Sequence, residues 1–121
     1  GITASMLAAK KNHSTILVLL MQAGADINQT TYLNRTVLQI AALYKSVEAG
    51  KVLVSHPQMH VNNRDELCAL AVAARENHIE FVSLLLSLKG TQSPTSRCLR
   101  GAREAARTKG NIEIFKLLTR A

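Results

Sequence analysis

Apolar residues recur along this chain in short stripes with the spacing of a helix face. Ile16-Leu17 with Leu20-Met21, and later Phe81-Val82 with Leu85-Leu86, place apolar side chains at i, i+1, i+4 and i+5. A pair of alanines and a short polar stretch precede each stripe. The pattern predicts units of two helices, a short first helix that packs closely through its alanines and a second helix with an apolar stripe. The predicted helix pairs lie near residues 4–22, 37–55, 69–87 and 100–118.

The alanine pairs return at a nearly fixed period. Ala8-Ala9, Ala41-Ala42 and Ala73-Ala74 lie 33 and 32 residues apart, and Ala105-Ala106 follows 32 residues later. Neither helix of a unit can bury its apolar face alone, so successive units must stack into one continuous core. The sequence therefore predicts a helical repeat architecture.

The first unit carries a more specific pattern. Gly1-x-Thr3, Ala8-Ala9-Lys-Lys-Asn-His13, Ile16-Leu17 and Ala23-Gly-Ala-Asp-Ile-Asn28 follow one another in order. This resembles the ankyrin repeat, whose pattern is G-x-T-P-L-H-x-A-A-x-x-G-H-x-x-I-V-x-x-L-L-x-x-G-A-D-V-N. The resemblance implies an all-α ankyrin-repeat solenoid of stacked antiparallel helix pairs with short β-turn fingers. It covers nearly all of residues 1–121, with repeats at about 1–30, 31–62, 63–90 and 91–121.

The sequence departs from the family pattern in three places that bear on the expected structure. The second unit has Ala49-Gly50 where Ile-Val is usual, and a helical glycine costs about 1 kcal/mol relative to alanine, so we expect this unit to be the softest. In the fourth unit, Gly110-Asn111 arrives one position late if Ala105-Ala106 is the alanine pair. The connector Lys89–Leu99 is rich in turn-forming residues, and we expect it to be irregular.

The two cysteines, Cys68 and Cys98, do not resemble a disulfide framework. We expect Cys68, which stands where the repeat usually has Thr, to be buried and inert, and Cys98 to be exposed in the connector. Free thiols indicate a reducing, intracellular compartment, the cytoplasm or the nucleus, or delivery into a host cell as an alternative. Because the chain begins at Gly1, we expect a piece of a longer protein. Truncation at Gly1 would then leave an apolar face on the first unit, which a preceding repeat or cap would cover in the longer protein.

No constellation in the sequence indicates catalysis, a cofactor or a metal site, and we expect the protein not to be an enzyme. His13 and His78 occupy the same position in their units, which is typical of a structural turn residue rather than a metal ligand. His56 and His60 are four residues apart, but Pro57 disfavours one continuous helix there. A nucleophile with a neighbouring base and an oxyanion stabiliser is not recognisable.

The family resemblance implies a non-catalytic protein–protein interaction module that binds through its concave side. That side comprises the finger tips and the exposed side of the first helices. The finger positions here are Tyr32, Leu33, Arg35, Arg64, Asp65 and Leu67. The positions after the alanine pairs are Lys10, Lys11, Leu43, Tyr44, Arg75, Glu76 and Arg107. We expect a monomer that binds an acidic or mixed-charge protein segment, because basic and aromatic residues recur at these positions.

Charge leaves two alternatives open. The formal net charge is +7, and residues 97–121 contain seven basic and two acidic residues. Arg100, Arg103 and Arg107 would share one side of a helix, either as a solvated end face or as a patch that binds nucleic acid or anionic lipid. A third interpretation is a targeting or spacer segment of a larger enzyme, scaffold or bacterial effector.

Overall fold

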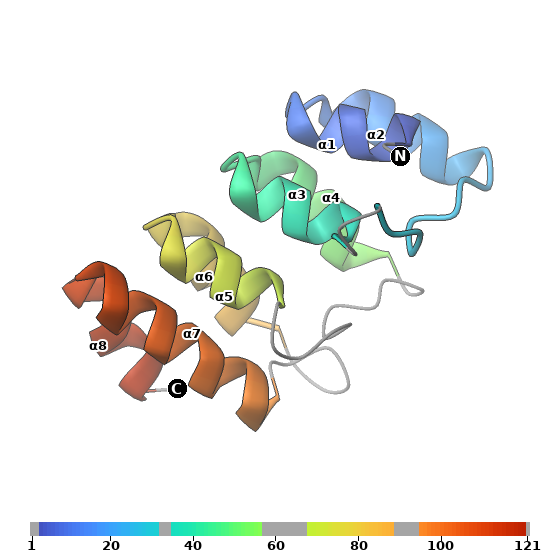
Figure 1. Ribbon diagram of the computed structural model, residues 1–121. Coiled ribbons are helices and arrows are strands. Elements are labelled where there is room, and N and C mark those ends of the chain that lie inside the picture. The colour runs from blue at the N-terminus through green and yellow to red at the C-terminus, as the bar shows by residue number, and fades with distance from the viewer. Residues whose placement is uncertain (1–2, 32–34, 57–67, 89–94, 121) are drawn as a thin grey trace. The chain divides into compact units, whose positions relative to one another are not determined.

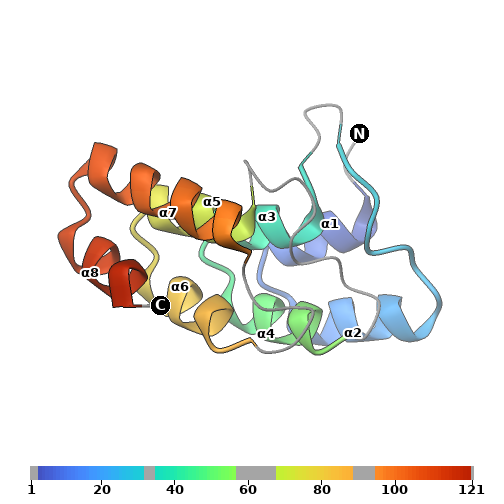
Figure 2. The ribbon, with the colours of Figure 1, turned by 90° about the horizontal axis from the view of Figure 1, so that it is seen from below.

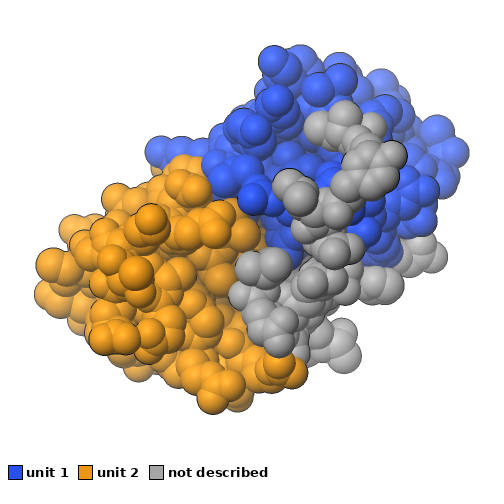
Figure 3. Space-filling view, in the orientation of Figure 1, with its two compact units in different colours: residues 1–60 blue, residues 61–121 orange. Residues whose placement is uncertain are grey.

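The computed structural model describes residues 3–31, 35–56, 68–88 and 95–120. Within these ranges the chain forms eight helices and no strand, so the all-α prediction is confirmed. The chain divides into two compact units, residues 1–60 and 61–121, which Figure 3 colours separately. Each unit contains two of the four predicted helix pairs.

The first unit contains α1 (Ala4–Lys10), α2 (Ser14–Gln22), α3 (Val37–Leu43) and α4 (Val47–Ser55). The two first helices, α1 and α3, lie side by side, and the two second helices, α2 and α4, form a layer behind them (Figures 1 and 2). Leu17 and Leu53 are fully buried between these layers, and the alanines Ala8 and Ala41 are buried as predicted. Small side chains on the first helices allow the close approach of neighbouring pairs.

The first helices begin at residues whose side chains cap them. Thr3 Oγ1 accepts the N–H of Met6 at 3.2 Å. In the second repeat, Thr36 Oγ1 accepts the N–H of Gln39 at 3.1 Å, and Gln39 Oε1 accepts the N–H of Thr36 at 3.0 Å. These bonds satisfy backbone donors that the first turn of a helix leaves unpaired. The family's proline is therefore not needed to fix where these helices start.

The turn between the two helices of each pair has the same geometry four times. One residue of each turn has a positive φ, at Asn12 (57°), Lys45 (57°), Asn77 (60°) and Gly110 (74°). The next residue donates its backbone N–H to the carbonyl of the alanine five positions earlier. These bonds are His13 to Ala8 (2.9 Å), Ser46 to Ala41 (2.8 Å), His78 to Ala73 (2.9 Å) and Asn111 to Ala106 (2.9 Å). Ala106 is thus the equivalent of Ala8, which settles the register of the fourth repeat.

The second unit contains α5 (Ala69–Arg75), α6 (Ile79–Leu86), α7 (Ser96–Lys109) and α8 (Ile112–Arg120). At 14 residues α7 is longer than the other first helices, each of which has seven. Thr95 caps it by accepting the N–H of Cys98 at 3.1 Å. Residues 96–99 are therefore helical, and the expectation of an irregular connector is wrong for them, while residues 89–94 lie outside the description.

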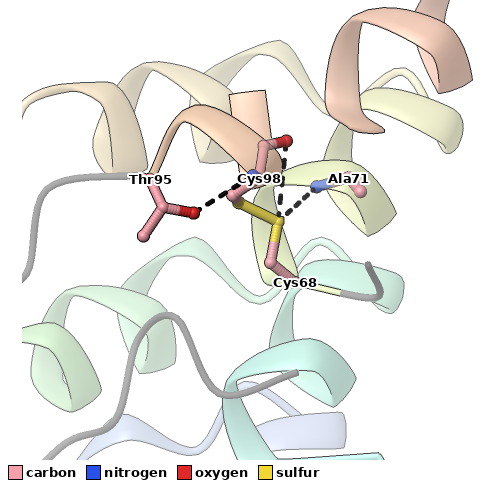
Figure 4. The surroundings of a disulfide bond; sticks show 4 residues. All are labelled: Cys68, Ala71, Thr95 and Cys98. Atoms are coloured by element: carbon pink, nitrogen blue, oxygen red, sulfur yellow. Dashed lines mark hydrogen bonds between the residues drawn. A yellow bond between two sulfur atoms is a disulfide. The ribbon is translucent and has the colours of Figure 1, made fainter. Parts of the chain in front are cut away.

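A disulfide joins Cys68 to Cys98, so the expectation of two free thiols is wrong (Figure 4). Cys68 is the N-cap of α5, where its Sγ accepts the N–H of Ala71 at 3.4 Å. Cys98 lies in the first turn of α7 and is 1% exposed, because α7 begins four residues before the predicted start. The two Cα atoms are 6.0 Å apart. Disulfides persist in oxidising environments, so these cysteines do not support a reducing compartment.

Candidate functional site

In the first unit, the ends of the first helices bring a lysine and a tyrosine from neighbouring repeats together. Lys10 is the last residue of α1, and Tyr44 is the C-cap of α3. The Lys10 ammonium lies 5.2 Å from the centre of the Tyr44 ring, within the range of a cation–π interaction. Tyr44 is nevertheless 49% exposed, so about half of its surface is open to a partner.

The surroundings of this pair are positively charged. Lys10, Lys11, Tyr44 and Lys45 are all exposed, and we call these four residues the lysine–tyrosine patch. In the part of the chain that the structure describes, none of the ion pairs involves one of these lysines. The nearest acidic residue along the chain, Glu48, is paired with Lys51 at 3.4 Å. The patch therefore combines an open aromatic face with uncompensated positive charge.

The first finger is anchored beside α3. The N–H of Arg35 donates to Thr31 Oγ1 at 3.2 Å, and the N–H of Thr31 donates to the Arg35 carbonyl at 3.0 Å. Arg35 is half-buried, as is Leu43 at the end of α3. The other predicted finger residues lie outside the described residues. They are Tyr32, Leu33, Arg64, Asp65 and Leu67.

The second unit presents different chemistry at the same positions. Arg75 and Glu76 end α5, as Leu43 and Tyr44 end α3. Their side chains form an ion pair, with Arg75 Nε 3.7 Å from Glu76 Oε1, and both remain partly exposed. Because the two charges compensate each other, this position is less suited to attract a charged partner than the lysine–tyrosine patch.

Arg107 does not occupy the position that the sequence pattern gave it. The register set by Asn111 and Ala106 places Arg107 at the position of the second alanine of each pair, so the equivalents of Lys10 and Lys11 are Thr108 and Lys109. Arg107 is exposed and pairs with Glu104 at 2.7 Å. The hydrogen bond and the negative charge of Glu104 both raise the pKa of the Arg107 guanidinium.

The basic side of α7 exists as predicted. Arg100 is exposed and Arg103 is half-buried, while Cys98, Ala102 and Ala106 form the buried side of the helix. Spacings of three and four residues place both arginines on the same side as Arg107. This surface carries two cations without an acidic partner among the described residues, because Glu104 is engaged by Arg107.

The histidines behave as turn residues. His13 and His78 are the N-caps of α2 and α6, and neither makes a side-chain cap hydrogen bond. The described ranges contain no cluster of three side chains that could hold a metal ion, and His60 lies outside them. Of the helices described, none has the length and the apolar character needed to cross a membrane.

Comparison with known protein families identifies the family. The family model for ankyrin repeats (3 copies) matches residues 4–97, which is more than half of the chain. The protein therefore belongs to the ankyrin-repeat family. Members of this family are typically non-catalytic and generally act as protein–protein interaction modules. The match ends within α7, where the fourth helix pair departs from its predecessors in length and surface charge.

Proposed function

We propose that this chain binds another protein without catalysing a reaction, and that it binds through the ends of its first helices and the adjacent fingers. The observation that carries the proposal is the contact between Lys10 and Tyr44 on the exposed surface of two neighbouring repeats. Tyrosine is among the residue types that contribute most to protein interfaces. An exposed tyrosine at this place contributes little to the core.

The variation between repeats supports the same surface. The scaffold alanines Ala8, Ala41 and Ala73 recur, whereas the helix-end positions carry Lys-Lys, Leu-Tyr and Arg-Glu in turn. Positions that the stack leaves free can take the side chains that a particular partner requires. In the first unit, Arg35 and Leu43 extend the proposed surface, and Arg75 and Glu76 are the equivalent proposed positions of the second unit. The finger residues predicted from the sequence belong to the same proposal.

The chemistry of the lysine–tyrosine patch specifies the kind of partner. A carboxylate of an acidic or mixed-charge protein segment would pair with Lys10, Lys11 or Lys45, and an apolar side chain beside it would cover the Tyr44 ring. Complementary charge raises the rate of association, while the buried aromatic contact contributes most of the affinity. We propose that the chain engages this segment as a monomer.

The test uses the protein that co-purifies with this chain, purified separately and titrated by calorimetry at two salt concentrations. We expect Tyr44→Ala to weaken binding by about 30-fold or more, as loss of a central contact does. Lys10→Ala should weaken binding mainly at low salt. Lys51→Ala is the matched control, because Lys51 is already paired with Glu48. Unchanged affinity of Tyr44→Ala would contradict the proposed surface.

The basic side of α7 supports a second candidate function, the binding of nucleic acid or anionic lipid. Arg100 and Arg103 lie on one side of a helix without acidic partners among the described residues. Such binding would weaken steeply with salt and would depend little on the partner's sequence. It would be abolished by Arg100→Glu with Arg103→Glu and unaffected by Tyr44→Ala. If neither set of substitutions changes any interaction, the chain is a spacer or targeting segment of a larger protein.

A further inference from the structure

The oxidised cysteine pair changes the significance of a motif that recurs in the turns. Cys68 and Cys98 are joined by a disulfide, and each is 1% exposed, so the bond is shielded from solvent. Such bonds form and persist in proteins that are secreted or pass through an oxidising lumen. In proteins that take this route, the tripeptide Asn-x-Ser/Thr accepts N-linked glycans when x is not proline. The chain contains three of these tripeptides: Asn12-His13-Ser14, Asn28-Gln29-Thr30 and Asn34-Arg35-Thr36.

Two of the three asparagines in these tripeptides belong to the described residues, and Asn12 is the more exposed of the two. It lies in the turn between α1 and α2, with a φ of 57°. Asn28 is half-buried, and its backbone N–H donates to Asp26 Oδ1 at 2.9 Å. Asn34 lies outside the described residues. A glycan is bulky and hydrophilic, so it requires an asparagine at the surface, and the exposure of Asn12 meets this requirement best.

The amide group of Asn12 uses its oxygen in the fold and leaves its nitrogen available. Oδ1 accepts the N–H of Ala49 at 3.1 Å, whereas Nδ2, the atom that carries the sugar, makes no hydrogen bond within the described part of the chain. A glycosylated amide keeps its oxygen, so the bond from Ala49 can persist with the sugar attached. Asn111 provides the contrast. Its Nδ2 donates to the carbonyl of Ala74 at 2.6 Å, and Glu113 stands where an acceptor tripeptide needs a hydroxyl.

Ser14 supplies a hydroxyl that the fold itself does not use. It is the first residue of α2 and half-buried, and its hydroxyl makes no hydrogen bond within the described ranges. The third repeat has the same turn, with Asn77 at a φ of 60° followed by His78, but there Ile79 takes the place of Ser14. The turn therefore forms without a hydroxyl at this position. Recognition as part of an acceptor tripeptide is the role that fits the chemistry of Ser14.

We propose that Asn12 carries an N-linked glycan, in a protein whose Cys68–Cys98 bond forms in the same oxidising compartment. The sugar donor is a lipid-linked pyrophosphoryl oligosaccharide, used by an oligosaccharide transferase of that compartment. The bond between the anomeric carbon of the first sugar and the pyrophosphate oxygen breaks, and the lipid pyrophosphate leaves with the electron pair. The anomeric carbon forms a new bond to Asn12 Nδ2, which releases one proton to a base of the transferase. This proposal does not rest on the partner proposed for the lysine–tyrosine patch.

Peptide mapping by mass spectrometry of the protein isolated from its source cells tests the glycan and the disulfide together. We expect a disulfide-linked pair of peptides that contain Cys68 and Cys98, and a glycopeptide that contains Asn12. An amidase that removes N-linked glycans should convert Asn12 to an aspartate and incorporate heavy oxygen from labelled water. An unmodified Asn12 would overturn the proposal. Free thiols at both cysteines would overturn it as well, because the chain would then not have passed through an oxidising compartment.

Matched variants of the full chain, sent through the secretory pathway of eukaryotic cells behind a cleavable leader, test the acceptor tripeptide. The unsubstituted chain and Ser14→Thr should carry a glycan at Asn12. Ser14→Ala should lose this glycan and keep the melting temperature of the deglycosylated protein, because the Ser14 hydroxyl makes no hydrogen bond within the described ranges. Asn77, in the same turn without a hydroxyl two residues later, is the internal control and should stay unmodified. A secreted, folded chain without a glycan at Asn12, or a glycan that persists in Ser14→Ala, would overturn the proposal.

Discussion

The two units of this protein share a fold but join their helix pairs differently. In the first unit, the turn residue Asn12 reaches the next repeat, where its Oδ1 accepts the N–H of Ala49 at 3.1 Å. In the second unit, Asn111 reaches back instead, and its Nδ2 donates to the carbonyls of Ala74 at 2.6 Å and Arg75 at 3.3 Å. The second unit adds a covalent connection at the other end of α7, through Cys98.

This difference suggests that the two units have different roles, stability in the second unit and recognition in the first. Helix α7 is attached to α5 near its N-terminus by the disulfide and just beyond its C-terminus by Asn111. The first unit has polar and apolar contacts alone, but it presents the lysine–tyrosine patch and an open apolar groove that Leu7 and Ile16 line. We infer that the second unit is the more firmly held and that the first carries the surface that binds the partner. The predictions that follow test this contrast, in order of decreasing effect.

Removal of the disulfide should have the largest effect on stability. Cys68→Ala with Cys98→Ala should destabilise the second unit by roughly 2–4 kcal/mol, because a crosslink across 30 residues restricts the unfolded chain. Hydrogen exchange should accelerate in α5 and α7 and stay unchanged in α1 and α2. Treating the unsubstituted protein with a reductant should produce the same pattern once the bond has been reduced.

A matched variant separates the crosslink from the helix cap. Cys68→Thr with Cys98→Ala restores the residue that the repeat usually has at the N-cap of α5. It should recover about 0.5–2 kcal/mol relative to the double alanine variant, since a threonine hydroxyl caps a helix well. Equal exchange rates of α7 in the double alanine variant and the unsubstituted protein would show that the disulfide contributes nothing.

Overpacking should have an intermediate effect that depends on position. Ala41→Leu and Ala73→Leu place a larger side chain where exposure is 0%, and each should cost about 1–3 kcal/mol. Ala8→Leu should cost less, because Ala8 lines the open apolar side of α1 and α2. Chemical denaturation of the three variants gives the comparison. Equal losses at Ala8 and Ala41 would mean that the first repeat is as closed as the second.

The asparagine contacts should have the smallest effect. Asn111→Ala removes two hydrogen bonds to the end of α5 and should cost about 1–2 kcal/mol, measured by thermal melting. Asn111→Asp should be no better, because a carboxylate cannot donate to the two carbonyls. Asn12→Gly keeps the positive φ of 57° accessible but removes the acceptor for Ala49, and it should cost about 0.5–1.5 kcal/mol.

Much of the fold could be predicted because the repeat constrains it. The apolar stripes and the recurrent alanines located all four helix pairs, and Ala8, Ala41 and Ala73 are buried as predicted. The departures lie where the fourth repeat differs from the pattern. There the longer α7 and the turn at Gly110 shift the register by one residue, which moved Arg107 from the helix-end surface to an alanine position.

The disulfide was missed although the sequence contained a usable signal. Residues separated by about one repeat period lie side by side in stacked repeats, and the cysteines are 30 residues apart. The prediction of two free thiols did not take this proximity into account. The sequence placed Lys10 and Tyr44 on the predicted binding surface, but it does not show that their side chains touch across two repeats. The expected softness of the second repeat, from Gly50 in α4, stays a prediction.

The measurement that tests the account most directly is a hydrogen-exchange footprint of this chain with and without its co-purified protein partner. We predict slower exchange at the ends of α1 and α3, around Lys10 and Tyr44, with no change along the basic side of α7. Protection of Arg100 and Arg103 with none at Tyr44 would contradict the account and would assign binding to the α7 surface instead.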